Sequence, residues 1–278
     1  MIEINGLGFS YKDNKVLENI TMTLKEGCIY GLLGENGVGK TTLLTLLSGL
    51  KRPQQGSILM DGRNPSDRQP GLLGNQFYLM DEVAPMAMKA GEYARMYGSF
   101  WPDFDMSRFE GIMQLLEMEP DRKMDKLSLG QLKRVYIAFA LSCNAKYYYL
   151  DEPTNGLDIP AKALFRKALS KYTREDATVV ISTHQVRDLE NIIDPIIILD
   201  KCDVLLNASV DEISDKLFFD YSGQPSADAL YSEMIPGMSV QVTPNPTHAE
   251  SKVNIEALFN TVHRHKEEIK KLFGKSEM

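Results

Sequence analysis

The sequence has no run of about 18 to 20 consecutive apolar residues, the length that a membrane-spanning helix requires. Its first residues, Met1 to Ile4, include no basic stretch followed by an apolar one, so we expect no signal peptide. If the protein works at a membrane, we therefore expect a separate chain to supply the membrane part.

Cysteine and positive charge are both scarce. The three cysteines, Cys28, Cys143 and Cys202, each lie in an apolar stretch without paired spacing, which favours reduced core thiols over disulfides or a metal site. Lys and Arg number 31 against 38 Asp and Glu, and the net charge of -7 argues against broad nucleic-acid binding, which usually needs a basic face. The sequence also has no internal repeat and no low-complexity tract.

The remaining composition is that of a globular protein. The chain has 278 residues, of which 43% are hydrophobic, enough for one large domain, alone or with a small appendage. Its first third predicts a mixed sheet around one central helix. The predicted strands are residues 2–4, 16–24, 28–33 and 57–60, and the predicted buried helix is 41–47.

A helical insertion is expected over about residues 81–126, where Met and aromatic residues recur at helical spacing. Within it, Trp101 and Phe104 form either an aromatic binding patch or, as we favour, part of the insertion's own core. After a helix that runs from Leu132, strands and helices alternate, which indicates parallel β-α-β units. These segments are strands 147–150, 178–182 and 196–199 and helices 159–172 and 185–192. Beyond residue 209 come two linker-like stretches, 222–226 and 243–247, and an amphipathic helix over 254–273.

The most specific motif is a glycine-rich loop that fits the pattern G-x-x-x-x-G-K-[ST]. Its residues are Gly34, Glu35, Asn36, Gly37, Val38, Gly39, Lys40 and Thr41. The glycines let backbone N–H groups point inward, where they and the following helix stabilise phosphate oxygens. We expect Lys40 to contact the β- and γ-phosphates, the Thr41 hydroxyl to bind Mg²⁺ and Thr42 to add a phosphate contact. The strand before the loop and the buried helix after it distinguish it from a chance string of turn residues.

A hydrophobic strand over residues 147–150 ends in two acids, Asp151 and Glu152. At the carboxyl end of the strand, Asp151 is placed to hold Mg²⁺ through water, beside Thr41. Glu152 is the candidate general base that orients the water attacking the γ-phosphate. Alone, such a pair is usually just a strand end, but the phosphate loop upstream favours the catalytic interpretation.

A second motif, Leu127, Ser128, Leu129, Gly130 and Gln131, stands shortly before this strand. It resembles the Leu-Ser-Gly-Gly-Gln signature of the ATP-binding cassette (ABC) family of ATPases. Other motifs of that family appear in order over roughly residues 1–209. Residues 153–158 resemble its D-loop, which ends at Asp158, and residues 182–184 resemble its switch-histidine segment, with His184. Tyr11 stands where the family stacks an aromatic ring on adenine, with Val16 nearby.

The resemblance implies that two cassettes pair head to tail, so that each signature closes over the ATP of its partner. Ser128, Gly130 and Gln131 would then act in trans. Physically, Ser128 is a suitable N-cap, and Gly130 permits a close backbone approach. The resemblance also implies that His184 contacts the γ-phosphate and supports Glu152.

Two positions depart from the family pattern. Leu129 replaces the second signature residue, which predicts lower geometric freedom rather than loss of function. Asp81 stands where the Q-loop glutamine is expected, although Gln76 substitutes for it if the loop is shifted. A carboxylate at this position can still contact Mg²⁺ or water.

Together these features predict an α/β fold, an ABC ATPase core with a mixed sheet around the phosphate loop over residues 1–209, followed by a small α+β extension over 210–278. The resemblance implies the ATP-hydrolysing subunit of an ABC transporter, similar to bacterial exporter types. Its expected partners are a second cassette and separate transmembrane subunits. The transmembrane subunits would choose the substrate, and they would hold the ATPase in the cytoplasm at the inner face of the membrane. The alternative is a soluble ABC ATPase in translation or DNA maintenance, which the single cassette and the lack of a long heptad coiled coil disfavour. A catalytically silent regulator is disfavoured by the intact Lys40, Asp151, Glu152 and His184.

Overall fold

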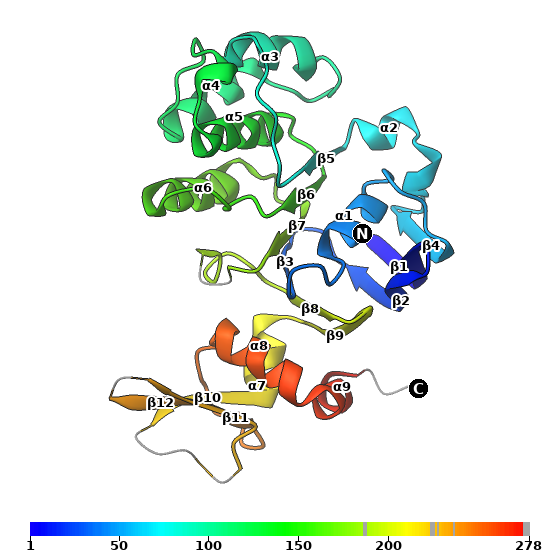
Figure 1. Ribbon diagram of the computed structural model, residues 1–278, viewed down its shortest axis with the longest axis vertical. Helices are drawn as coiled ribbons and strands as arrows, with labels where there is room; N and C mark the ends of the chain where they lie inside the picture. The colour runs from blue at the N-terminus through cyan, green and yellow to red at the C-terminus, as the bar shows by residue number, and fades with distance from the viewer. Residues whose placement is uncertain (186–187, 223–225, 227, 236, 275–278) are drawn as a thin grey trace.

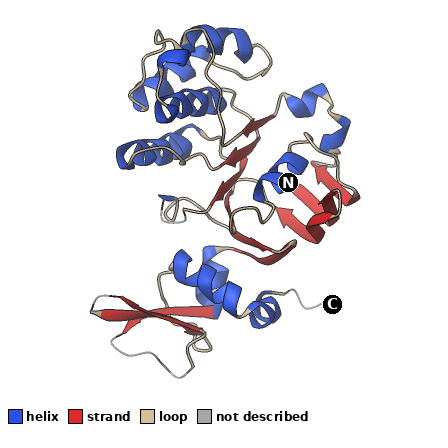
Figure 2. Ribbon diagram, in the orientation of Figure 1, coloured by secondary structure: helices blue, strands red, loops and turns tan. Residues whose placement is uncertain are grey.

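A six-stranded sheet runs through the centre of the computed structural model, which describes residues 1–185, 188–222, 226, 228–235 and 237–274 (Figures 1 and 2). In spatial order its strands are β5 (Gln76–Leu79), β6 (Tyr147–Asp151), β7 (Thr178–Thr183), β3 (Ile29–Leu33), β8 (Ile196–Asp200) and β9 (Asp203–Ala208). Neighbouring strands are parallel except β9, which runs antiparallel to β8. Strands β6, β7 and β8 are buried along their whole length, which explains their largely apolar sequences.

A smaller antiparallel sheet lies beside the N-terminal part of this sheet. Its order is β2 (Asn14–Leu24), β1 (Ile2–Tyr11) and β4 (Gln55–Met60). Helix α1 (Lys40–Leu47) packs between the two sheets in one apolar cluster, to which both sheets contribute. Strand β1 is longer than the predicted 2–4, because Gly6, at φ 57°, makes a bulge in the strand rather than the turn that Asn5 and Gly6 suggested.

A helical region covers the end of the large sheet at β5 and β6 (Figure 1). It contains α3 (Ala90–Gly98), α4 (Met106–Leu115) and α5 (Leu129–Ser142), with α6 (Ile159–Tyr172) beneath them. Short elements complete the connections: η1 (Pro65–Asp67), α2 (Pro70–Leu73) and η2 (Met124–Lys126). Trp101 and Phe104 both pack against Phe139 of α5, so they belong to the core of this region, as we favoured, and not to a separate binding patch.

The C-terminal part has its own antiparallel sheet, in the order β10 (Leu217–Ser222), β12 (Met238–Pro244) and β11 (Tyr231–Ile235). Around it lie α7 (Val210–Lys216), α8 (Ile255–Arg264) and α9 (Lys266–Phe273). The stretch expected to be a linker at 243–247 therefore begins inside a strand. The single helix predicted over 254–273 is interrupted at His265, whose φ of -121° and ψ of 47° are not helical.

Two of the predicted helices, 185–192 and 159–172, have different outcomes in the structure. The helix predicted over 185–192 is wrong for the residues described: Asp188 has a 3₁₀ conformation, 189–192 form turns, and 186–187 lie outside the described residues. The helix predicted over 159–172 has the bounds of α6.

Within the described ranges, no helix is long and apolar enough to cross a membrane.

Candidate active site

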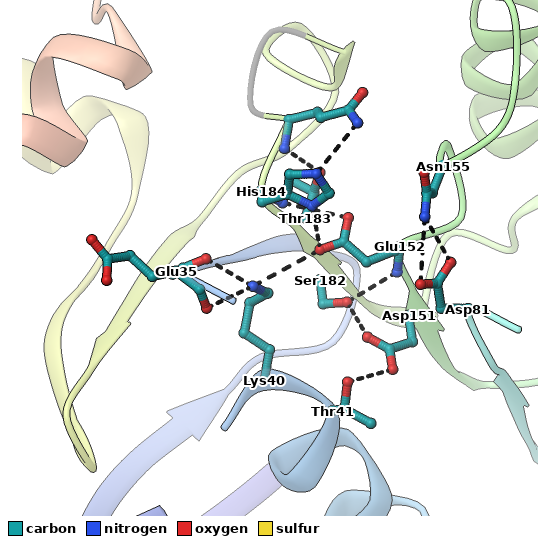
Figure 3. Close-up of polar contacts among 12 residues, drawn as sticks. Glu35, Lys40, Thr41, Asp81, Asp151, Glu152, Asn155, Ser182, Thr183 and His184 are labelled. Carbon is teal, nitrogen blue, oxygen red and sulfur yellow. Dashed lines mark hydrogen bonds and ion pairs between the residues drawn. The ribbon is translucent and has the colours of Figure 1, made fainter. Parts of the chain in front are cut away.

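The glycine-rich loop follows β3 directly and ends where α1 begins at Lys40 (Figure 3). Gly39 has a φ of 115°, and a Cβ there would lie 2.9 Å from Cγ1 of Val16, so both the backbone angle and the space require glycine. The buried Lys40 Nζ donates to the carbonyl oxygens of Gly34 at 2.7 Å and Glu35 at 3.1 Å. The loop thus curls around the ammonium group at the start of a helix, an arrangement suited to anions.

The charge of Lys40 is balanced by two acids at the end of β6. Its Nζ lies 3.8 Å from Oε1 of Glu152. Burial lowers the pKa of Lys40 below its usual value, while the charges of Glu152 and Asp151 act in the opposite direction. A further negative charge in this site, such as that of a phosphate, would therefore stabilise the charged form of Lys40.

Asp151 is held by hydroxyl groups on three sides. The Thr41 hydroxyl donates to its Oδ2 at 2.6 Å, Ser182 donates to its Oδ1, and the Tyr78 hydroxyl lies 3.5 Å from Oδ2. Burial and the charge of Asp151 raise the pKa of Tyr78, which keeps that hydroxyl protonated. The pair of a threonine hydroxyl and a carboxylate offers the hard oxygen ligands that Mg²⁺ prefers.

These two oxygens do not form a complete metal cage. In the part of the chain that the structure describes, no three His, Cys, Asp or Glu side chains gather in a group that could hold a metal ion. Mg²⁺ is commonly bound by one or two protein groups together with substrate phosphates and water. Thr41 and Asp151 fit that kind of site.

Glu152 is buried and has a φ of 44°, a left-handed conformation that is costly for a residue with a side chain. Its backbone N–H lies within hydrogen-bonding distance of Ser182 Oγ at 3.0 Å, and its Oε1 lies 2.9 Å from Nδ1 of His184 (Figure 3). This pairing arises because β6 and β7 are adjacent and parallel, so the residues that follow them meet at one edge of the sheet. A carboxylate fixed in this way is suited to accept a proton from water.

Most of the predicted nucleotide residues line one cavity of about 310 Å³. Its lining comprises Tyr11, Asn14, Val16, Asn36, Gly37, Gly39, Lys40, Thr41, Thr42, Asp81, Asp151 and Glu152. The half-exposed Tyr11 is positioned by its hydroxyl, which lies 3.4 Å from Oγ1 of Thr42. Val38 packs instead against the apolar cluster around α1. Gly34, Glu35 and His184 line a second cavity of about 530 Å³, whose opposite wall is Phe259 and its neighbours on α8.

The predicted signature residues lie elsewhere. Ser128 caps α5 and exchanges hydrogen bonds with Gln131: the Gln131 N–H donates to Ser128 Oγ at 3.3 Å, and the Ser128 N–H donates to Gln131 Oε1 at 3.1 Å. Neither they nor Gly130 line the cavity at the phosphate loop. Asp158 is also outside it and caps α6 through a 2.8 Å bond from the Ala161 N–H.

Asp81, not Gln76, faces the cavity. Gln76 is buried in β5, and its side chain donates to the Ser48 carbonyl at 2.9 Å. The Asp81 carboxylate is bonded to Lys133 at 2.8 Å and to Asn155 at 3.2 Å. The position expected to hold a Q-loop glutamine is thus occupied by one half of an ion pair.

No sequence motif predicted a role for Lys133 or Tyr78, and Ser182 was noted only as part of the segment 182–184, without its contact to Asp151. One signal for Lys133 was available: it lies four residues before Ile137 on α5, so a charged residue occupies the buried face of that helix. No comparable signal identifies Tyr78 or Ser182, because their contacts with Asp151 depend on how β5, β6 and β7 are ordered in the sheet.

Comparison with known proteins agrees with this architecture. A family model described as ABC transporter matches residues 17–155. The SkfA peptide export ATP-binding protein SkfE of Bacillus subtilis (strain 168) is 31% identical over 208 residues, which cover 72% of this chain and 85% of that protein. A solved ATP-binding subunit of an ABC transporter has a TM-score of 0.70 at 23% identity, over 77% of this chain and 91% of that one. A cassette solved as a dimer in a post-hydrolysis state with ADP and Pi has a TM-score of 0.67 at 24% identity, over 75% and 98% of the two chains. The predicted fold class is confirmed.

Proposed function

The chain belongs to the ABC transporter family, as one of its ATP-binding and ATP-hydrolysing subunits, and we propose that the cavity at the phosphate loop is the site where it binds and hydrolyses ATP. The observation that carries this proposal is the convergence of Lys40, Thr41, Asp151 and Glu152 on one cavity, with His184 bonded to Glu152. These residues come from three separate segments of the sequence, residues 40–41, 151–152 and 184, yet the side chains of each suit ATP binding or hydrolysis.

Binding uses the loop and the start of α1. Backbone N–H groups of Gly37, Gly39 and Lys40 and the positive end of the helix stabilise the phosphates, and the Lys40 ammonium neutralises charge on the β- and γ-phosphates. The ring of Tyr11 stacks on the adenine, and Val16 also lines this cavity. Thr41 and Asp151 are the residues that would hold Mg²⁺, which when bound would supply further charge neutralisation at the phosphates.

Hydrolysis depends on Glu152. Its carboxylate takes a proton from a water molecule as the water oxygen forms a bond to the γ-phosphorus. The bond between that phosphorus and the β–γ bridging oxygen breaks, and the electron pair stays on ADP. His184 holds Glu152 in position through the 2.9 Å contact. From the family resemblance we also expect it to contact the γ-phosphate.

The second copy completes the site. Ser128, Gly130 and Gln131 do not line the cavity of their own chain, and the N-terminus of α5 that they form is suited to an anion. We infer that two chains pair head to tail, so that each signature closes over the ATP of the other. ATP favours the closed pair because it contacts both chains, and hydrolysis removes the γ-phosphate contacts and lets the pair reopen.

Separate membrane subunits would use this cycle. The helical region over about residues 81–126 is the surface that we propose for their cytoplasmic loops, because it projects from the ATPase core (Figure 1). Contact with those subunits would hold the protein at the inner face of the membrane. An export direction stays a prediction from the resemblance.

The direct test is ATP turnover by the purified chain with and without Mg²⁺. We expect Mg²⁺-dependent release of phosphate from wild type, and its loss in Glu152→Gln with ATP binding retained. Rapid turnover by Glu152→Gln would remove this residue from the role of general base. Absence of ATP binding by wild type would contradict the site itself.

A further inference from the structure

Lys133 is a buried lysine whose ammonium group has a complete set of partners. Its side chain is 1% exposed. The Nζ donates to Oδ1 of Asp81 at 2.8 Å, to the Glu152 carbonyl oxygen at 2.8 Å and to the Asn155 carbonyl oxygen at 3.0 Å. An ammonium group has three N–H donors, so each of them is used. One atom thus joins the Q-loop position, the candidate general base and the D-loop.

Lys133 also connects these residues to the signature. It lies in α5, whose first turn contains Gly130. A Cβ at Gly130 would lie 2.6 Å from the Gly156 carbonyl oxygen, so the start of the helix and the D-loop are in close contact. Helix α5 therefore holds the segment from Glu152 to Gly156 at two points, one through backbone packing and one through the Lys133 ammonium.

Lys133 contacts the backbone of Glu152, which is in an unfavourable left-handed conformation. Because Glu152 has a φ of 44°, surrounding bonds must hold its backbone in place. Ser182 meets its N–H group and Lys133 meets its carbonyl group, so the peptide units on either side are both fixed. The direction of the Glu152 carboxylate follows from the position of this backbone.

The contact with Asp81 balances the charge of Lys133. A buried ammonium group without a counter-charge is strongly disfavoured, and the Asp81 carboxylate supplies that charge from the wall of the cavity. Asp81 is 37% exposed, and Asn155 donates to it from the other side. Its carboxylate is therefore engaged by two protein groups.

We propose that Lys133 is a positioning residue for Glu152, and that Asp81 acts on hydrolysis by holding Lys133 rather than by binding Mg²⁺ or the nucleotide itself. This rests on the proposed function, since it concerns the same ATP site. It explains how an acid occupies the Q-loop position: the acid and the buried lysine operate as a unit. A displacement of the loop at Asp81 would change the position of the Lys133 side chain, which contacts the Glu152 carbonyl oxygen.

The test is a double-mutant cycle on steady-state ATP hydrolysis, with Lys133→Met, Asp81→Asn and the double variant. We expect Lys133→Met to lower kcat about tenfold or more, because Glu152 loses a bond that holds it, and to leave KM and the equilibrium affinity for Mg-ATP within about twofold. Asp81→Asn should give a smaller loss of kcat. The double variant should be no slower than Lys133→Met, since Asp81 has no effect without Lys133.

Lys167→Met is the matched control, because Lys167 is an exposed lysine of another helix, α6. It should have the kcat of wild type. Thermal unfolding of every variant separates misfolding from mispositioning, and Lys133→Gln, which keeps N–H donors without the charge, should recover part of kcat. If Lys133→Met does not fold, Lys133→Gln takes its place in the double-mutant cycle.

Three results would overturn the proposal. A folded Lys133→Met with wild-type kcat would remove Lys133 from positioning. Independent losses that multiply in the double variant, or a Mg²⁺ requirement that Asp81→Asn raises equally in both backgrounds, would make Asp81 a direct ligand. If wild type itself does not hydrolyse ATP, the proposed function fails instead, so the two failures are distinguishable.

Discussion

The imidazole Nδ1 of His184 lies 2.9 Å from Oε1 of Glu152, and the backbone N–H of His184 lies 3.4 Å from Oε2 of the same carboxylate. Both oxygens of the proposed general base are therefore held by one residue at the end of β7. Since the contact joins residues that follow two adjacent parallel strands, the sheet itself sets the distance between them.

This contact predicts that His184→Ala lowers kcat by about 10²–10⁴, the range typical of a lost general acid–base arrangement. ATP affinity should change much less, because Lys40 and the loop are untouched. Steady-state kinetics and equilibrium nucleotide binding measure the two effects separately. His248→Ala is the control, since His248 is an exposed histidine paired with Asp215 in the C-terminal part, and it should leave kcat unchanged. Equal losses in both variants would contradict a specific role for His184.

The depressed pKa of Lys40 predicts a pH limit on ATP binding. Burial lowers this pKa below the ordinary value of 10.5, so Lys40 loses its proton at a lower pH than an exposed lysine. Bound triphosphate favours the charged form. Affinity should therefore be constant while Lys40 is protonated and should fall as the pH rises through its pKa, at a pH below 10.5.

Titration calorimetry with Mg-ATP at increasing alkaline pH measures this fall. Lys40→Met is the control, with weak binding that lacks this pH dependence, because no proton is lost from residue 40. If wild type and Lys40→Met decline in parallel, another group controls the effect.

The aromatic cluster around Phe139 predicts where the helical region is vulnerable. Phe139 is 1% exposed and contacts the rings of Phe77, Tyr93, Trp101 and Phe104. Phe139→Ala should reduce the free energy of unfolding by about 3–5 kcal/mol, because a cavity remains where the ring was. Phe100→Ala, at a ring that is 70% exposed, should change it by about 0.5 kcal/mol or less. Urea unfolding followed by circular dichroism compares them, and similar losses would mean that the cluster is not the stabilising core.

Much of the fold followed from local patterns in the sequence. The strands around the phosphate loop and the helix α6 have strong local signals, and the glycine pattern placed the loop between β3 and α1. Errors arose where tertiary contacts override such signals. The pair Asn5 and Gly6 looks like a turn, yet β1 continues through it as a bulge because it pairs with strands on both sides. At His265 the apolar periodicity continues although the backbone turns.

The site was predictable where one segment supplies the chemistry, and less so where several do. Motifs predicted Lys40, Asp151 and Glu152 as candidate site residues, and all three line one cavity. The contacts of Lys133 with Asp81 and Asn155, in contrast, join residues 52 and 22 positions apart. No local pattern encodes such a meeting. It depends on how α5 packs against β5 and against the loop after β6.

Sedimentation velocity of Glu152→Gln with Mg-ATP shows whether a second copy caps the ATP held by the phosphate loop. We expect a dimer with Mg-ATP and a monomer with Mg-ADP. Adding Ser128→Arg, which blocks the capped start of α5, should leave ATP bound and abolish the dimer. If Glu152→Gln binds Mg-ATP and remains monomeric at every concentration tested, no second copy caps the nucleotide.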